Sequence, residues 1–325
     1  MTIATYQEEF LAFLKKNNID KNPKNLYTPI NYILDLGGKR IRPTLLLIAA
    51  DLFGNTYQKA LDAALAVEVF HNFTLLHDDI MDNSPLRRGK TTVHEKWNIN
   101  TAILSGDVML INAYQYLEKY DASSYKSLMQ LFSKTAQEVC EGQQYDVDFE
   151  TLNNVKITDY IEMIRLKTAV LLACSLKMGA IIANASTADA TTIYNFGINL
   201  GLAFQLQDDL LDALGNPKTF GKRIGGDIIA NKKTYLHLLL LEKADKTDKK
   251  TILTLYNNKT KAAEETTKIT VITNFYKKYG IDKATQQLID TYSNKALEDL
   301  NQISAENETK TLLANYVNKL QSRIV

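Results

Sequence analysis

The sequence predicts an all-α fold in a single large domain covering residues 1–325. Apolar residues recur at helical spacing over long stretches, and no stretch alternates polar and apolar residues clearly enough to indicate a strand. Only five prolines and 14 glycines interrupt these patterns. The apolar content of 45% supports a large buried core, and no linker or change of composition marks a second domain.

The expected helices follow one another along the chain. Phe10, Leu11, Phe13 and Leu14 lie on one side of the first, Pro23 begins the second, and an apolar run forms the third. Two later ones end in acidic clusters, and Lys232 and Lys233 fall in the first turn of another. We expect helices over about residues 3–17, 23–36, 44–53, 57–81, 101–119, 123–148, 158–184, 188–213 and 231–242, and helices again from there to the C-terminus.

Composition excludes several classes of protein. The net charge of +1 gives no electrostatic footprint for nucleic acid. Cys140 and Cys174 both lie in helical patterns, which argues against a disulfide scaffold and favours a reducing compartment. Glu8 and Glu9 stand where a signal peptide would be apolar, and Lys177 interrupts the longest apolar stretch. We therefore expect a cytoplasmic protein without a transmembrane segment.

The first acidic cluster lies in the segment FHNFTLLHDDIMDNSPLRRG, residues 70–89. Asp78 and Asp82 are four residues apart, so on a helix their side chains point the same way. Two carboxylates this close repel each other unless a cation lies between them, and carboxylate oxygens suit Mg²⁺. Arg87 and Arg88 follow, as an anion-binding pair would. Alone, this pattern is also typical of a solvated helix face.

A second acidic cluster repeats the spacing and favours a functional interpretation. The segment GLAFQLQDDLLD, residues 201–212, places Asp208, Asp209 and Asp212 at the end of another apolar helical run. Two such clusters are hard to explain as surface decoration. If they face each other, they can hold metal ions with a diphosphate between them.

Basic segments supply candidate anion sites. GGKRIRP, residues 37–43, is either a helix C-cap whose cations complement the helix dipole or a second anion site. GNPKTFGKRIGGD, residues 215–227, lacks the spacing and preceding strand of a P-loop and is predicted to be a mobile lid carrying Lys222. Lys167 either snorkels or points into a polar cavity. His71 is either a core residue or lines that cavity.

In this order, GGKRIRP, DDIMD followed by RRG, LKT, FQLQDDLLD and GKRIGGD resemble the trans-isoprenyl diphosphate synthases, or polyprenyl synthetases, over about residues 35–235. The resemblance implies about ten helices around a central cavity, as in isoprenoid synthases, and a homodimer. It also implies a head-to-tail condensation of isopentenyl diphosphate with an allylic diphosphate. The cofactor implied is Mg²⁺, with three ions per active site.

The resemblance also assigns roles to individual residues. Metal ligands would be Asp78, Asp82 and, on the opposite helix, Asp208, while Asp79, Asp209 and Asp212 complete the acidic rims. The allylic diphosphate or its surroundings would be held by Arg87, Lys167, Thr168, Gln205, Lys222 and Lys232. The isopentenyl diphosphate site would contain Lys39, Arg42, His71 and Arg88. Leaving-group charge would then be stabilised by Mg²⁺ and cationic side chains, with no side-chain nucleophile.

Product length in this family depends on the residues four and five positions before the first aspartate, here Thr74 and Phe73. One aromatic residue, one small residue and no insertion in DDIMD resemble the pattern for geranylgeranyl diphosphate (C20). Farnesyl diphosphate (C15) is the alternative, and products of C30 or longer are not expected.

Two other classes of protein share parts of this pattern. A terpene cyclase usually carries an Asn/Ser/Glu metal motif in place of the second aspartate motif. It also binds only one diphosphate, so the basic segment GGKRIRP would have no second diphosphate to bind. A non-catalytic subunit of a heteromeric synthase typically loses aspartates from one motif, whereas this chain keeps both.

Overall fold

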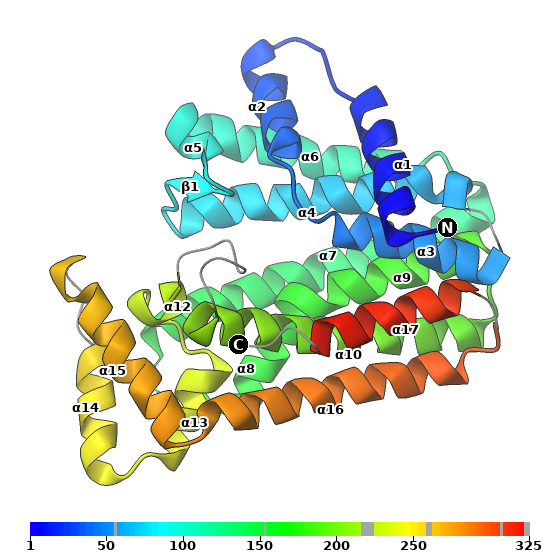
Figure 1. Ribbon diagram of the computed structural model, residues 1–325. Coiled ribbons are helices and arrows are strands. Elements are labelled where there is room, and N and C mark those ends of the chain that lie inside the picture. Colours follow the sequence, from blue (N-terminus) through cyan, green and yellow to red (C-terminus); the bar gives the residue numbers. More distant parts are fainter. Residues whose placement is uncertain (55–56, 153, 216–223, 258–261, 306–307, 322–325) are drawn as a thin grey trace. The chain divides into compact units, whose positions relative to one another are not determined.

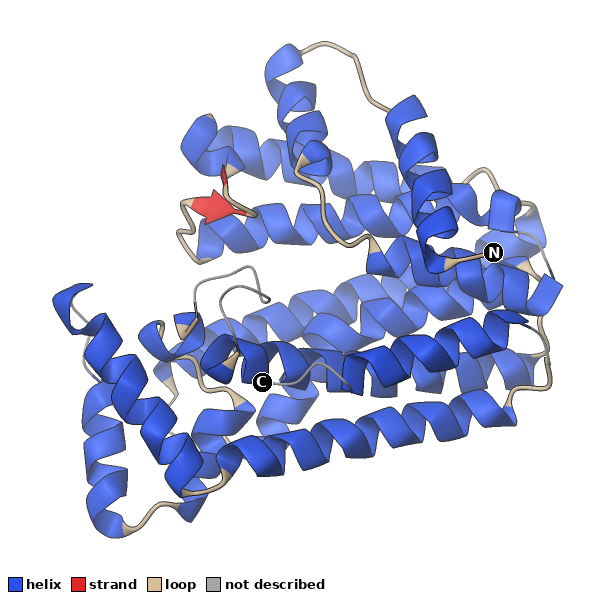
Figure 2. Cartoon of the chain, viewed as in Figure 1, coloured by secondary structure: helices blue, strands red, loops and turns tan. Residues whose placement is uncertain are grey.

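The computed structural model describes residues 1–54, 57–152, 154–215, 224–257, 262–305 and 308–321. Nearly all of them are helical, which confirms the all-α prediction (Figure 2). Strands among these residues are limited to one antiparallel pair, β1 (Leu86–Arg87) and β2 (Lys90–Thr91). No strand was expected here from the sequence. The pair forms because Arg88 and Gly89 both take positive φ angles, 54° and 74°, in a two-residue hairpin turn.

The helices outnumber the ten that the resemblance implied, and they group into two units. Unit 1 contains residues 1–134, 174–194 and 304–312, and unit 2 contains residues 135–173, 195–303 and the described part of 313–325. The division falls within four helices, so each unit combines segments that are distant in the sequence. That residues 1–325 act as a single domain stays a prediction.

Unit 1 is built on helices from the N-terminal part of the chain (Figure 1). Its elements are α1 (Ile3–Lys16), α2 (Lys24–Asp35), α3 (Ile41–Gly54), η1 (Tyr57–Ala60), α4 (Leu61–Met81), α5 (Val93–Lys96) and α6 (Ile99–Leu117), with the first residues of α7 (Ala122–Thr151). Helix α3 is apolar around its whole circumference and is buried from Pro43 to Leu52. Gly179 on α9 (Val170–Ile182) lets the backbones of α3 and α9 meet, because a Cβ there would collide with the Leu46 carbonyl.

Unit 2 contains most of the later helices. Its elements include α8 (Ile157–Ile164), η2 (Arg165–Ala169), α12 (Gly226–Ile229), α13 (Tyr235–Lys243), α14 (Lys246–Asn257), η3 (Ala262–Glu264), α15 (Glu265–Lys278) and α16 (Ile281–Gln302). Three further helices contribute to both units: α9 (Val170–Ile182), α10 (Thr187–Leu214) and α17 (Glu308–Gln321).

Two boundaries differ from the expectation in ways that concern candidate residues. The helix expected over residues 158–184 is interrupted by η2, a π-helical turn that carries Lys167 and Thr168. The prediction that Lys232 and Lys233 lie in the first turn of a helix is wrong. Helix α13 begins at Tyr235 after the N-cap Thr234, so both lysines precede it.

His237 in α13 makes the stability of the fold depend on pH. Burial, together with the neighbouring Lys233 and Lys268, lowers the pKa of its imidazole from 6.5 to about 3. The unfolded chain therefore binds a proton that the folded chain rejects. This stability is complete above pH 6.5 and is lost as the pH falls toward 3, at about 1.4 kcal/mol per pH unit.

We expect the free energy of unfolding to fall by about 2 kcal/mol more between pH 7 and pH 5 in the wild type than in His237→Phe. Phenylalanine keeps the ring that stacks on Tyr256, whose centroid lies 3.7 Å away. Urea unfolding at both pH values measures the difference. The same pH dependence in both proteins would show that His237 is not the group that titrates.

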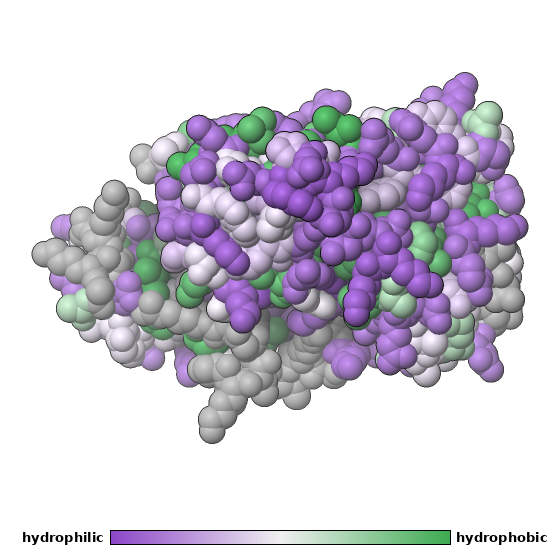
Figure 3. Space-filling model, turned by 90° about the horizontal axis from the view of Figure 1, so that it is seen from above, coloured by the Kyte–Doolittle hydropathy of each residue, from purple (hydrophilic) through white to green (hydrophobic). Residues whose placement is uncertain are grey.

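On the face shown in Figure 3, hydrophilic residues predominate and apolar ones are scattered between them, as on most protein surfaces. Within the described residues, no helix combines the length and the apolar character that crossing a membrane requires.

Candidate functional site

In unit 1, the first acidic cluster lies where α4 ends. The side chain of Asp78 is 18% exposed, and Asp82 is the C-cap, whose N–H donates to the Asp78 carbonyl at 2.9 Å. The last turn of the helix therefore fixes the four-residue spacing of these two carboxylates. Asp79 points the other way and is buried, with 2% of the residue exposed.

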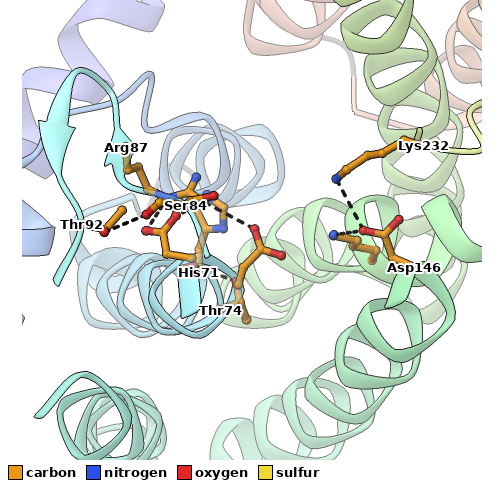
Figure 4. Close-up of polar contacts among 10 residues, drawn as sticks. His71, Thr74, Ser84, Arg87, Thr92, Asp146 and Lys232 are labelled. Carbon is orange, nitrogen blue, oxygen red and sulfur yellow. Dashed lines mark hydrogen bonds and ion pairs between the residues drawn. The ribbon is translucent and has the colours of Figure 1, made fainter. Parts of the chain in front are cut away.

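Arg87, labelled in Figure 4, lies on β1 and binds the buried member of the cluster. Its Nε lies 2.8 Å from both Asp79 carboxylate oxygens, and its Nη2 lies 3.4 Å from Asp78. Burial raises the pKa of the Asp79 carboxyl more than the Arg87 guanidinium lowers it. The hairpin thus neutralises Asp79 and leaves Asp78 and Asp82 as the more accessible pair, with Arg87 still partly exposed beside them.

The residues predicted for the isopentenyl diphosphate site include three cationic or polar groups that the structure brings together. Arg42 Nη1 donates to His71 Nε2 at 3.1 Å, since arginine has no acceptor. Burial, then Arg42 and Arg88, lower the pKa of His71 well below its usual value, so the imidazole is neutral. Arg88 donates to the Gly37 carbonyl and covers Gly38, where a Cβ would lie 2.7 Å from its Cζ. Lys39, in the same turn, is exposed.

Arg40 does not belong to this basic cluster, although it lies in GGKRIRP, the segment interpreted as either a helix C-cap or a second anion site. Its guanidinium pairs with Glu68 on α4 and donates to the Leu34 carbonyl on α2, and both side chains of the pair are 3% exposed. Asn72 also donates to the Glu68 carboxylate, at 2.9 Å. The third cation is therefore used to fix the turn that carries Lys39 and Arg42.

The two residues predicted to set product length lie on α4, one turn before Asp78. Phe73 is 8% exposed and its ring lies between those of Phe70 and His77, at centroid distances of 5.6 and 4.8 Å. Thr74 is partly exposed and donates its hydroxyl to the His71 carbonyl at 2.8 Å (Figure 4). Phe73 is therefore wedged between aromatic neighbours in a fixed position.

In unit 2, a close approach between α7 and η2 builds one side of a cavity. A Cβ at Gly142 would collide with the backbone of Lys167, so only glycine allows this packing. Asp146 lies one turn further along the same face of α7, and its Oδ2 is 2.5 Å from Lys167 Nζ. Lys232 Nζ lies 3.9 Å from the same oxygen (Figure 4).

A glycine-lined face of α10 builds the other side. Cβ atoms at Gly197 and Gly201 would each lie 2.5 Å from a Cα of the neighbouring segment, at Ala173 and Ala169 respectively. The backbones therefore pack closely, and Gln205, one turn further, accepts a hydrogen bond from the Thr168 hydroxyl at 3.0 Å. The π-helical turn holds Thr168 in place for this contact; such turns are frequent at functional sites.

Asp209 is the buried member of the second acidic cluster, as Asp79 is of the first. The Tyr160 hydroxyl donates to one of its carboxylate oxygens, and Gln205 Nε2 donates to the other at 2.9 Å. Burial, and then the nearby Asp227, raise the pKa of the Asp209 carboxyl well above its usual value. Asp208 is half-buried, and Asp212 accepts the Asp227 N–H at 2.9 Å.

Most of these side chains line a cavity of about 90 Å³ in unit 2, whereas Asp208 and Asp212 are not among its lining residues. Its polar lining includes Asp146, Tyr160, Lys167, Thr168, Gln205, Asp209, Asp227 and Lys232. Five of the predicted substrate-binding or catalytic residues therefore line the same cavity: Lys167, Thr168, Gln205, Asp209 and Lys232. Lys222 lies outside the described residues.

Several lining residues were not among the predicted ones, and they include Asp146, Tyr160 and Asp227. Asp146 and Tyr160 belong to none of the motifs, whereas Asp227 ends the GKRIGGD motif but was assigned no role. The signal for Asp146 was Gly142 four residues earlier, because an interior glycine in a long helix marks a close backbone approach. Tyr160 carried no comparable signal.

The acidic residues are suited to bind a Mg²⁺ ion that is also bound by phosphate oxygens of the substrate. Among the described residues, no three His, Cys, Asp or Glu side chains are grouped to hold a metal ion by themselves. Mg²⁺ commonly uses one or two carboxylates and completes its octahedron with water and phosphate oxygens. Asp78 and Asp82, on adjacent turns and outside the buried Arg87–Asp79 pair, meet that requirement.

Comparison with known proteins identifies the family. Residues 23–273 match the model of the polyprenyl synthetase family. The geranylgeranyl diphosphate synthase of Saccharolobus solfataricus is 37% identical over 309 residues, which are 94% of this chain and 92% of that protein. The geranylfarnesyl diphosphate synthase of Natronomonas pharaonis is 39% identical over 67% of this chain and 69% of its own.

A solved structure agrees with these relatives. A crystal structure of a geranylgeranyl pyrophosphate synthase superimposes with a TM-score of 0.95 at 48% identity, and all of each chain is covered. The predicted enzyme class, prenyl transfer, is confirmed by these likenesses. The chain therefore belongs to the polyprenyl synthetase family.

Proposed function

We propose that this protein joins isopentenyl diphosphate head to tail with allylic diphosphates and that its main product is geranylgeranyl diphosphate. The observation that carries this proposal is that both acidic clusters are complete. Each cluster has two at least partly exposed aspartates, Asp78 and Asp82 in the first and Asp208 and Asp212 in the second. The third aspartate of each is buried: Asp79 is paired with Arg87, and Asp209 accepts a hydrogen bond from Tyr160. A silent subunit of a heteromeric enzyme would not need to keep both.

Two different sets of residues would bind the two diphosphates. Bound Mg²⁺, up to three ions, would supply positive charge to the diphosphate that leaves the allylic substrate. Lys167, Thr168, Gln205 and Lys232 would bind that diphosphate, and Lys222 would join them. Lys39, Arg42, His71 and Arg88 would hold isopentenyl diphosphate close to the reacting carbon. Arginine forks bind phosphate oxygens in two places at once, which suits this task.

Both acidic clusters would serve this one reaction, with Asp78 and Asp82 contributed by unit 1 and Asp208 by unit 2. We propose this because each cluster lies at the end of a largely buried helix. Apolar helix faces below the aspartates would exclude water from the allylic cation.

Product length is proposed from Phe73, since relatives of similar identity are named after different products. Its ring is buried between two other rings, so it would block a chain growing along α4. Incubation with radiolabelled isopentenyl diphosphate and farnesyl diphosphate, followed by separation of the dephosphorylated products, tests the proposal. We expect C20, and a main product longer than C25 would contradict it.

Phe73→Ala should lengthen the main product by at least one C5 unit, because it removes the side chain that closes the cavity floor. The same product assay measures the change. Phe73→Tyr keeps the ring in place and serves as the control, for which we expect no product longer than that of the wild type. An unchanged product in Phe73→Ala would place the floor elsewhere.

We propose a homodimer, with α6 in the interface. Four apolar side chains on this helix are more than one-third exposed: Ile99, Ile103, Leu104 and Ile111. An apolar helix face of this kind usually covers a partner. Light scattering should show a dimer for the wild type and monomers for Leu104→Glu, whereas Leu11→Glu, at an exposed position on α1, should remain dimeric.

We also propose that the enzyme works in the cytoplasm. Neither Cys140 nor Cys174 is disulfide-bonded, as expected in a reducing compartment.

A terpene cyclase is the second candidate, and a measurement of pyrophosphate release distinguishes it from the proposed synthase. Release that requires isopentenyl diphosphate supports the proposed synthase, whereas release from the allylic substrate alone supports a cyclase.

A further inference from the structure

Asp146 lies between two lysines that come from different parts of the chain. Lys167 belongs to the π-helical turn η2, and Lys232 to the segment that precedes α13. Both ammonium groups approach the same carboxylate oxygen, at 2.5 and 3.9 Å. The Asp146 side chain is 20% exposed, against 26% and 33% for the two lysines. The carboxylate thus lies deeper than the cations it joins.

The end of α7 also anchors the segment that carries Lys232. The next residue, Lys233, donates to the carbonyl of Phe149 and lies 3.3 Å from the carbonyl of Glu150. These carbonyls belong to the last turn of α7, where a cation complements the helix dipole. Two successive lysines therefore attach to one helix end, one through a carboxylate and one through main-chain oxygens.

Two ammonium groups repel each other and strongly prefer water to a half-buried site. A carboxylate between them offsets both effects. The charges of Lys167 and Lys232 indeed lower the pKa of Asp146, although burial raises it, so this carboxylate is ionised at neutral pH. Asp146 therefore stabilises both ammonium groups at this spacing beside the cavity.

We propose that Asp146 is a positioning residue: it holds the ammonium groups of Lys167 and Lys232 at the cavity so that both meet a bound diphosphate. The inference rests on the proposed function only in naming that diphosphate as part of the allylic substrate. Asp146 acts through the lysines and contributes no chemistry to the reaction.

The test compares Asp146→Asn with Asp148→Asn in the full-length protein. Asp148 lies on the same helix two residues away, is exposed, and accepts a hydrogen bond from Gln144. Its replacement therefore repeats the chemical change at a position that touches neither lysine. Calorimetric titration with Mg²⁺ and inorganic pyrophosphate measures binding without any turnover, and steady-state kinetics give KM for each substrate.

For Asp146→Asn, we expect pyrophosphate binding to weaken and KM for the allylic diphosphate to rise, each roughly 10- to 100-fold, as for the loss of a charged hydrogen bond. KM for isopentenyl diphosphate should stay within about twofold. Asp146→Glu should recover part of the loss because it restores the charge, and it replaces Asp146→Asn if that variant does not fold. Asp148→Asn should match the wild type.

Two results would overturn the inference. Equal or tighter pyrophosphate binding in Asp146→Asn would mean that Asp146 merely competes with phosphate for the lysines. Equal increases in KM for both substrates would indicate a general structural defect. A different result would contradict the proposed function without contradicting the role of Asp146: wild-type protein that binds pyrophosphate but forms no prenyl product with any substrate pair.

Discussion

Replacing Arg40 by methionine should lower the free energy of unfolding by about 3–5 kcal/mol, because it leaves the buried carboxylate of Glu68 without its cation. Asn72 still donates to that carboxylate, but an amide does not neutralise its charge. Urea unfolding at neutral pH measures the loss. The turn that carries Lys39 and Arg42 also loses its attachment to α4, so we expect KM for isopentenyl diphosphate to rise.

The double variant Arg40→Met, Glu68→Gln is the control for this interpretation. It removes both charges, so it should be more stable than Arg40→Met alone, although still below the wild type. A double variant whose loss equals the sum of the two single losses would show that the ion pair is not the source of the effect.

Asp82→Asn should reduce turnover by roughly 10²–10³, the usual cost of removing one group that stabilises leaving-group charge. The half-maximal Mg²⁺ concentration should rise at the same time, because the last turn of α4 would offer one metal-binding carboxylate instead of two. Product formation measured over a Mg²⁺ titration gives both values. Since Asp82 is exposed at the helix end, the midpoint of thermal unfolding should change little.

Asp20→Asn provides a surface control, since Asp20 is exposed in an ion pair with Lys24. We expect its turnover and Mg²⁺ dependence to match the wild type. Near-normal turnover of Asp82→Asn at low Mg²⁺ would exclude Asp82 as a metal ligand.

Much of this enzyme could be predicted from local sequence. Helical periodicity indicated the all-α fold, and most helix boundaries lie within a few residues of the expected positions. Motif spacing also indicated the family, since the two aspartate clusters and the basic segments occur in a fixed order. These features depend on neighbours in the chain, so sequence spacing is enough to find them.

Contacts between distant segments could not be predicted in this way. Nothing in GGKRIRP distinguishes Arg40, which is buried against Glu68, from Arg42, which reaches His71. Lys232 was expected inside a helix, but its segment is attached to α7 and the helix begins later.

The sequence by itself determined the helices, the family and the residue types available for a diphosphate. Only the tertiary structure decided which charges serve the fold and which remain for the substrate. The reason is physical: a charge is neutralised by whichever group packs next to it. Arg87 binds Asp79 from 8 residues away, Lys167 binds Asp146 from 21, and Tyr160 binds Asp209 from 49.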